Sequence, residues 1–139
     1  MLCAINEANK SNNDIPIGCV ITKDNKIIST AHNEKELKND VSLHAEIVAM
    51  KRAGEYFKNW RLIDCDLYVT LEPCPMCAFA ILSSGIKNVY FGAYDINYGS
   101  FGSKIDMRNL LNRKINVYGG IMEKECEKIL VDYFKNIRE

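Results

Sequence analysis

Residues 66–85 read DLYVTLEPCPMCAFAILSSG, a β-rich run that passes directly into a helix-forming run. The apolar segment Asp66–Leu71 predicts a buried strand. A residue before proline is pushed out of the α region, so Cys74 should be extended and the proline after it should open a helix. We therefore expect a helix over Pro75–Ser84, ended by Gly85. A strand that leads straight into a helix is typical of an α/β domain.

The rest of the chain continues this alternation of strands and helices. Asp24-Asn25 between two β-rich runs predicts a hairpin, which makes the sheet mixed rather than purely parallel. The expected strands are Gly18–Thr22, Lys26–Thr30, Asp66–Leu71, Lys87–Gly92 and Ile115–Tyr118. Three further helices are expected: one near Ile5–Ala8, one that begins after Ser42 as N-cap, and one over Met122–Ile137. Polar loops are expected over Asn33–Ser42 and Ala93–Ser103. These elements predict one α/β domain over residues 1–139, a three-layer α/β/α arrangement with a mixed five-stranded sheet.

Length and composition limit the class of protein. The chain has 139 residues, 47% of them apolar and 26% charged, as in an ordinary globular domain. Its apolar runs are too short to span a bilayer. Asn6, Glu7 and Lys10 within the first ten residues leave no room for a secretory apolar region, so we expect a cytoplasmic protein with no membrane partner. The 18 basic and 18 acidic residues cancel, which argues against non-specific coating of nucleic acid but allows a local basic rim.

Two of the six cysteines are spaced to bind a metal. With Cys74 as N-cap, Cys77 becomes the third helical residue, and side chains at those two positions meet in a capping box. Both sulfurs thus converge on a helix N-terminus, where the helix dipole favours thiolate. The others lie in apolar contexts and are expected to be buried small hydrophobic residues: Cys3, Cys19, Cys65 and Cys126.

His44 and Glu46 complete the pattern. His44 is one of only two histidines and supplies a third ligand beside the thiolates. Three protein ligands with one open position are the arrangement of catalytic zinc, which lowers the pKa of bound water to about 7. Glu46 should face the metal without binding it, where a carboxylate can shuttle protons between water and substrate. His-x-Glu followed by Pro-Cys-x-x-Cys is typical of zinc-dependent deaminases.

Two other interpretations of the cysteine pair remain open. A Cys-x-x-Cys can be a redox motif, although a redox protein would not need the upstream His-x-Glu. A purely structural zinc site would need a fourth ligand, for which His32 and Cys65 are the candidates.

Several stretches between residues 14 and 103 resemble the bacterial tRNA adenosine deaminases of the cytidine deaminase superfamily. They are DIPIGCV at 14–20, LHAEIVA at 43–49, NWRLID at 59–64, LYVTLEPCPMCA at 67–78, and FGA at 91–93 followed by Asp95, Gly99 and Gly102-Ser103. His-Ala-Glu and Pro-Cys-x-x-Cys are shared with guanine, cytosine and deoxycytidylate deaminases. The loop GAYDINYGSFGS at 92–103 is more similar to the tRNA enzymes.

The resemblance implies a reaction and the residues that carry it. The implied reaction is hydrolytic deamination of the first anticodon adenosine of a tRNA to inosine, by attack of zinc-activated water on C6 and release of ammonia. One zinc ion (Zn2+) per chain would be held by His44, Cys74 and Cys77, with Glu46 as the catalytic proton carrier. The implied substrate contacts are the Asn33 side chain, the Ala45 backbone N–H, the apolar walls Ile17 and Leu71, and the acidic Asp95. Ile17 and Leu71 as plain core residues, and Asp95 as a turn cap, remain alternatives.

The resemblance also implies a homodimer, for which the apolar face of the zinc helix, Phe79 and Leu82, is a candidate surface.

The chain departs from the family pattern at four places: Tyr94 where arginine is common, Asn97 in place of a frequent lysine, Phe79 at a position that is usually small, and Val41-Ser42-Leu43 before the histidine. These departures bear on the substrate and not on the zinc chemistry.

Two alternative functions remain open. A free nucleobase or nucleotide deaminase, acting on guanine, cytosine or deoxycytidylate, would use the same zinc chemistry. A non-catalytic zinc or RNA-binding module would have no use for Glu46 beside an open zinc position.

Overall fold

The computed structural model describes residues 1–138, whose strands form one five-stranded sheet in the order β2-β1-β3-β4-β5. The strands are β1 (Gly18–Lys23), β2 (Lys26–His32), β3 (Asp66–Leu71), β4 (Asn88–Ala93) and β5 (Asn116–Tyr118). β1 is antiparallel to both β2 and β3, whereas β3, β4 and β5 are parallel. The predicted mixed sheet of five strands is confirmed.

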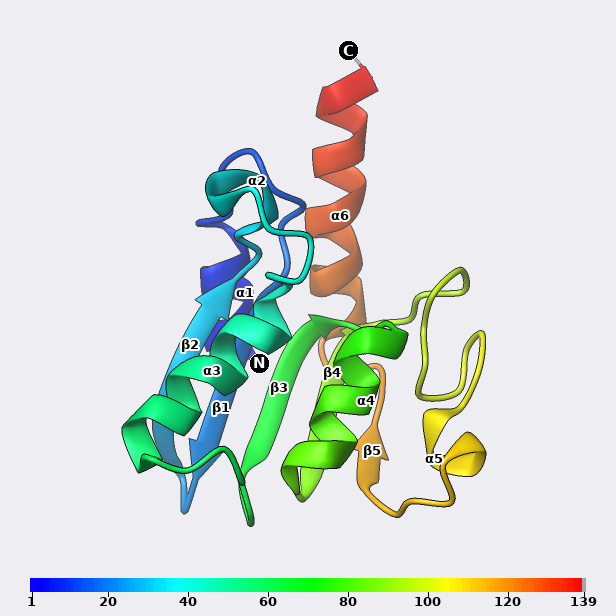
Figure 1. Ribbon diagram of the computed structural model, residues 1–139. Coiled ribbons are helices and arrows are strands. Elements are labelled where there is room, and N and C mark those ends of the chain that lie inside the picture. The colour runs from blue at the N-terminus through cyan, green and yellow to red at the C-terminus, as the bar shows by residue number, and fades with distance from the viewer. Residues whose placement is uncertain (139) are drawn as a thin grey trace.

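Helices cover both faces of the sheet, which confirms the three-layer α/β/α arrangement (Figure 1). One face carries α3 (Ala45–Phe57) and α4 (Pro75–Ser84), and the other carries α1 (Leu2–Ala8) and α6 (Glu123–Arg138). Two one-turn helices lie in connections that were predicted as loop or left unassigned: α2 (Lys35–Lys38) and α5 (Met107–Leu110). Among residues 1–138, no helix combines the length and the apolarity that crossing a bilayer requires.

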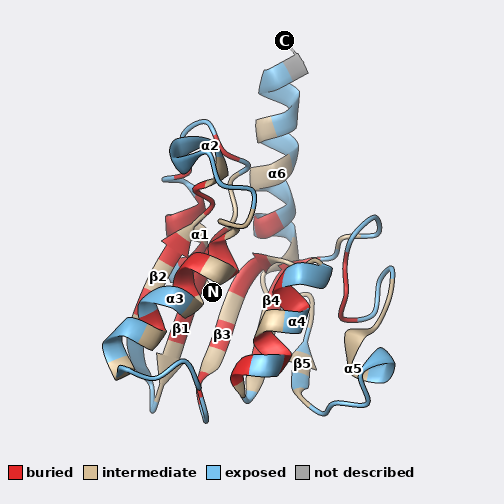
Figure 2. Ribbon diagram, viewed as in Figure 1, coloured by how far each residue is buried: buried red, intermediate tan, exposed pale blue. Residues whose placement is uncertain are grey.

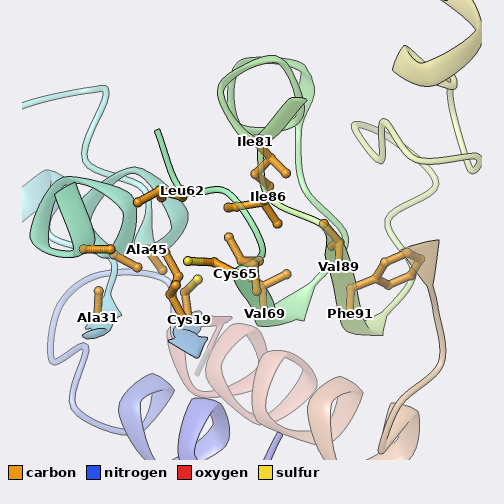
Figure 3. Close-up of a cluster of buried hydrophobic side chains, with 14 of the residues drawn as sticks. Cys19, Ala31, Ala45, Leu62, Cys65, Val69, Ile81, Ile86, Val89 and Phe91 are labelled. Carbon is orange, nitrogen blue, oxygen red and sulfur yellow. The ribbon is translucent and has the colours of Figure 1, made fainter. Parts of the chain in front are cut away.

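The hydrophobic core lies mainly between the sheet and the pair α3 and α4 (Figures 2 and 3). Cys19 and Cys65 are buried there, and Cys126 is buried where α6 meets β4. Cys3 is exposed, so the prediction that it is buried was wrong. Leu82 was also misplaced, because its side chain belongs to this core and not to an outer apolar face of α4.

The start of α3 differs from the prediction by two residues. Ser42 is not the N-cap, because its backbone N–H and its hydroxyl both donate to Asp40 Oδ1, at 2.9 and 2.6 Å. The chain therefore turns after Asp40, His44 is extended (ψ 153°), and the helix begins only at Ala45. His44 itself takes the N-cap position.

The apolar stripe predicted for the last helix is only partly covered. α6 packs on β4 near Cys126, where a Cβ on Gly92 would overlap the Cys126 side chain. Farther along, the helix continues past the edge of the sheet (Figure 1), and Phe134 and Ile137 are exposed. The predicted helix is confirmed, but the last part of its apolar stripe has no covering layer among residues 1–138.

Candidate functional site

The three predicted metal ligands lie where α3 and α4 begin, beside the end of β3 (Figure 1). His44 is the N-cap of α3 and Cys74 is the N-cap of α4, both with extended backbone. Pro75 is the first residue of α4 and Cys77 the third, as the spacing predicted. The N-terminal ends of two helices thus face one place, and the positive ends of their dipoles favour negative charge on the thiols and on a metal-activated water.

The geometry of the three side chains fits zinc. His44 Nδ1 lies 3.5 Å from Cys74 Sγ and 3.4 Å from Cys77 Sγ. The three ligand atoms all lie within 4.8 Å of one another. Ordinary Zn–S and Zn–N bond lengths with tetrahedral angles put N and S about 3.6 Å apart. A zinc ion therefore fits between these atoms with little movement, and the donor set of one imidazole and two thiolates is one that zinc prefers.

Hydrogen bonding within the triad sets the charge of its thiols. The pKa of Cys74 is lowered to about 4, mainly by a hydrogen bond from the Cys77 thiol and also by one from His44. The hydrogen bond with Cys74 raises the pKa of Cys77, and the bond between Cys74 and His44 raises the pKa of His44. The lowered pKa favours the thiolate form of Cys74, which is the form that zinc requires of its sulfur ligands.

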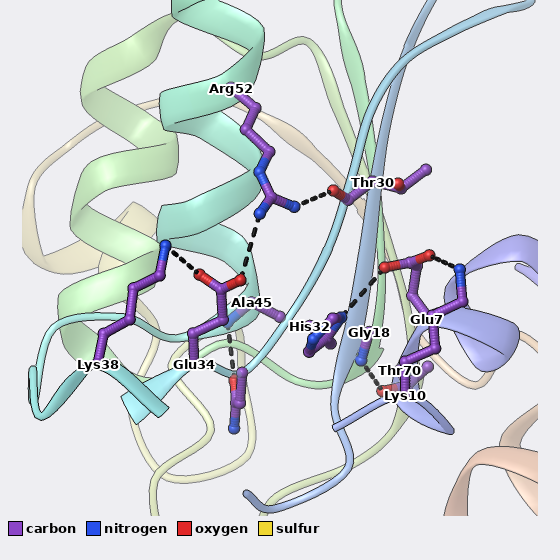
Figure 4. Close-up of polar contacts among 11 residues, drawn as sticks. Glu7, Lys10, Gly18, Thr30, His32, Glu34, Lys38, Ala45, Arg52 and Thr70 are labelled. Carbon is purple, nitrogen blue, oxygen red and sulfur yellow. Dashed lines mark hydrogen bonds and ion pairs between the residues drawn. The ribbon is translucent and has the colours of Figure 1, made fainter. Parts of the chain in front are cut away.

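Neither candidate for a fourth protein ligand joins the triad. His32 Nδ1 lies 3.2 Å from Glu7 Oε1, and Figure 4 shows this pair within a polar network on α1 and β2. Cys65 is buried in the hydrophobic core. Within residues 1–138 the only His, Cys, Asp or Glu cluster of metal-binding geometry is His44, Cys74 and Cys77, which leaves an open fourth position.

Glu46 is the buried acid beside this open position. It is the second residue of α3, is only 4% exposed and is not one of the three ligands. Burial raises the pKa of Glu46 to about 7, because water no longer stabilises the charged form. A carboxyl group with a pKa near neutrality can both accept and donate a proton at physiological pH, as a proton carrier must.

These groups line a cavity of about 410 Å³. The predicted substrate residues Ile17, Leu71, Asn33 and Asp95 lie on its wall. Ile17 is half-buried and packs against the core as well as lining the cavity, and its contact with a base stays a prediction. The full lining is Ile15, Ile17, Asn33, Lys35, His44, Glu46, Leu71, Glu72, Cys74, Pro75, Met76, Asp95 and Tyr98.

Two of the predicted base contacts are already bonded to each other. The Ala45 backbone N–H donates to Asn33 Oδ1 at 2.7 Å, a contact drawn in Figure 4. In this structure the Ala45 N–H is therefore used to orient Asn33. The bond fixes the amide so that its Nδ2 group remains for another acceptor, and direct contact of Ala45 with a base stays a prediction.

Asp95 caps a turn in the loop that follows β4. Its Oδ1 accepts hydrogen bonds from the Asn97 and Tyr98 backbone N–H groups, at 3.0 and 3.1 Å. The turn places Tyr98 on the cavity wall, with its ring exposed. Of the departures from the family pattern, Tyr94 packs edge-on against Phe91, with ring centroids 5.0 Å apart, instead of offering a cation.

Sequence reasoning gave no role to four residues of the wall: Ile15, Lys35, Glu72 and Met76. Lys35 brings a positive charge to the cavity from α2, in a segment that was predicted to be loop. Glu72 offered a usable signal, because a charged residue between Leu71 and Pro73 interrupts an apolar run two residues before the predicted ligand Cys74.

Comparisons with known proteins give the family of this chain. Residues 1–138 match the MafB19-like deaminase family. The tRNA-specific adenosine deaminase of Buchnera aphidicola is 44% identical over 93% of this chain and 86% of its own. That of Bacillus subtilis is 37% identical over 98% and 87%.

One solved structure comes from work on A-to-I editing by tRNA:A34 deaminases at the wobble position of transfer RNA. It is 37% identical, with a TM-score of 0.87, and the match covers 94% of this chain and 97% of that one. The likeness thus extends over nearly the whole length of both chains. The chain belongs to the MafB19-like deaminases, within the cytidine deaminase superfamily, and to the group of bacterial tRNA adenosine deaminases that its sequence resembles.

Proposed function

We propose that this protein is a zinc-dependent hydrolase that deaminates the wobble adenosine of a tRNA anticodon to inosine and releases ammonia. The observation that carries the proposal is the placement of a buried carboxyl, Glu46, beside a three-ligand metal site inside one cavity. The tRNA-specific relatives at 37–44% identity support adenosine in tRNA as the substrate. A tRNA substrate would place the enzyme in the cytoplasm.

His44, Cys74 and Cys77 would hold one zinc ion per chain, which when bound would make water nucleophilic at neutral pH. Glu46 would take a proton from water, pass it to ring N1 of adenine, and later protonate the departing amine. Its raised pKa of about 7 suits both halves of this task.

The remaining wall residues would hold the flipped base. Ile17 and Leu71 would offer it apolar surface, while Asn33, held by the Ala45 N–H, would offer Nδ2 to an acceptor on the purine. The target adenosine must leave the stack of the anticodon loop to reach the cavity. Tyr98 on the rim gives a stacking surface to a neighbouring base, and Lys35 gives a positive charge for the backbone.

The function is tested by incubating the zinc-loaded protein with an anticodon hairpin that carries the adenosine, and separately with free guanine and free cytosine. We expect ammonia and inosine from the hairpin alone. Rapid release of ammonia from either free base would instead support the nucleobase deaminase alternative. A protein that binds the hairpin and zinc but never forms inosine would be a binding module.

Asp95 is expected to help the enzyme prefer RNA over DNA. Its Oδ1 is occupied by the turn, so Oδ2 is the atom that can accept a hydrogen bond from a ribose 2′-hydroxyl, which DNA lacks. Asp95→Asn keeps an oxygen for the turn but weakens this acceptor. We expect kcat/KM on an RNA hairpin to fall by about tenfold, as for a lost bond to a charged group, and the value on a matched DNA hairpin to change much less. Equal losses on both would remove the 2′-hydroxyl role.

We further propose that two chains form a homodimer through the outer face of α3 and α4. Phe79 on α4 is 53% exposed. A groove of about 590 Å³ lies nearby, with apolar side chains of Ile47, Met50 and Trp60 along it. An apolar surface of this kind on a small domain is typical of an interface, and a two-fold axis would place the same face of each copy against the other.

Replacing Phe79 by lysine should separate the copies. Phe79→Lys puts like charges close together across a two-fold interface, and we expect the dimer to weaken by at least about thirtyfold, as for an interface hot spot. Sedimentation velocity over a concentration series measures this. Ile27→Lys is the matched control, because Ile27 is a similarly exposed apolar residue on β2. A wild-type protein that sediments as a monomer at all concentrations would contradict the dimer.

A further inference from the structure

Glu72 is a buried carboxylate with no cation beside it. The residue is 2% exposed, and within residues 1–138 no lysine, arginine or histidine forms an ion pair with it. Burying a charged group without an ion partner is costly unless hydrogen bonds replace the lost water. The role of Glu72 therefore depends on which groups supply those bonds.

All of its side-chain partners belong to the loop after β4. Oε1 accepts from the Asp95 N–H at 3.2 Å and from the Ser103 hydroxyl. Oε2 accepts from the Phe101 N–H and from the Ser103 N–H, both at 3.1 Å. These four donors come from both ends of the segment 95–103, which contains no helix or strand. One carboxylate thus closes a loop that regular secondary structure does not hold.

Gly99 shows that the middle of the loop is also closed around Glu72. A Cβ at Gly99 would overlap the Glu72 carboxylate and the Asp95 carbonyl. The Gly99 N–H donates to that carbonyl at 2.8 Å. The loop can wrap around the carboxylate this tightly only because residue 99 has no side chain.

The same short segment also carries the metal site. Glu72 stands between Leu71, which lines the cavity, and the ligand Cys74. The carbonyl of the intervening Pro73 accepts the Ser100 N–H at 2.9 Å, a further bond to the loop. The loop that carries Asp95 and Tyr98 is therefore bonded to Glu72 and Pro73, the two residues directly before the ligand Cys74. These bonds hold the rim of the cavity in a fixed position relative to the metal site.

We infer that Glu72 is a positioning residue that sets the affinity for RNA by holding the 95–103 loop in register with the metal site. The inference rests on the proposed function. Glu72 does not take part in the proton transfers, and its four loop bonds are independent of Glu46 and of the zinc ligands. Loss of these bonds should therefore affect binding of the hairpin and not the chemistry that follows.

The variant Glu72→Gln tests this, because the amide has the same shape but turns an NH2 toward groups that are themselves donors. We expect KM for the anticodon hairpin to rise by at least about tenfold, the effect of losing a bond to a charged group. We expect kcat to stay within about threefold and the zinc content to stay at that of the wild type. Backbone amides of residues 95, 101 and 103 should exchange with solvent faster in the free protein.

Two further variants keep the test decisive. Ser103→Ala removes one donor and leaves the carboxylate, so KM should rise by a smaller factor and kcat should not change. If Glu72→Gln does not fold, KM and kcat of Ser103→Ala test the positioning role of Glu72 instead. Glu7→Gln is the matched control, because Glu7 is also a buried carboxylate but is bonded to Lys10 and His32 on the α1 side. It should lower stability without changing KM.

Unchanged amide exchange in Glu72→Gln would overturn the positioning role, and so would a fall in kcat with KM unchanged. Faster exchange with an unchanged KM would overturn the link to RNA affinity. If the wild-type protein does not deaminate the hairpin at all, the proposed function fails and the RNA role with it. The exchange measurement still decides whether Glu72 holds the loop, since it needs no substrate.

Discussion

Glu46→Gln is expected to abolish most of the turnover while the protein stays folded, zinc-loaded and able to bind the hairpin. The amide fills the same buried space but cannot accept and release a proton at neutral pH. General acid–base catalysis contributes at least about a hundredfold, so kcat should fall by at least that factor. Because Glu46 is buried and is not one of the three ligands, neither the stability nor the zinc content should fall.

Single-turnover formation of inosine, elemental analysis and hairpin binding together check this result. Glu127→Gln, an exposed carboxylate on α6, is the control that should change none of them. Loss of zinc from Glu46→Gln would show that Glu46 is a ligand after all. Turnover close to that of the wild type would mean that another group carries the proton.

The parts of the site that could be predicted are those set by local backbone chemistry. Cys74 is extended because a proline follows it, and that proline then takes the first position of α4. Gly85 ends the helix in the left-handed conformation, with φ at 85°. These constraints act within a few residues, so the spacing of Cys74 and Cys77 on one helix end was readable from the sequence.

The parts that were mispredicted depend on competition between nearby or distant groups. Ser42 is a good N-cap residue in isolation, but the carboxylate of Asp40 takes both of its donors. The apolar side chain of Leu82 could face either the sheet or the outside of α4, and only the packing of the core decides. The bond between Asn33 and the Ala45 N–H joins positions 12 residues apart and follows from the way α3 returns to the sheet.

Glu72 could be predicted only in part, since its sequence context indicates a buried charge but not the groups that bond to it. A carboxylate inside an apolar segment predicts a buried charge that needs partners. The partners are the backbone N–H groups of residues 95, 101 and 103, and backbone groups leave no trace in the sequence. Only the serine hydroxyl and the missing side chain of Gly99 mark the contact, and each has other common explanations.

Cys74→Ala and Cys77→Ala should each lose both the zinc and the activity. Either change leaves two protein ligands, and the remaining pair cannot hold the ion against water. Turnover should fall further than in Glu46→Gln, because the activated water disappears together with the ion. A chelator should lower the melting temperature of the wild type, since a ligand that binds only the folded state stabilises it, and should leave both variants unchanged.

Cys65→Ala is the matched control for these two variants. Cys65 is a buried cysteine in the hydrophobic core and was the rival fourth ligand. Its loss removes a sulfur from the core, so we expect some loss of stability, with one zinc ion per chain retained and kcat unchanged. Zinc missing from Cys65→Ala would show a four-ligand structural site. Zinc retained in both Cys74→Ala and Cys77→Ala would disprove the assignment of the ligands, and with it the hydrolytic mechanism built on an open metal position.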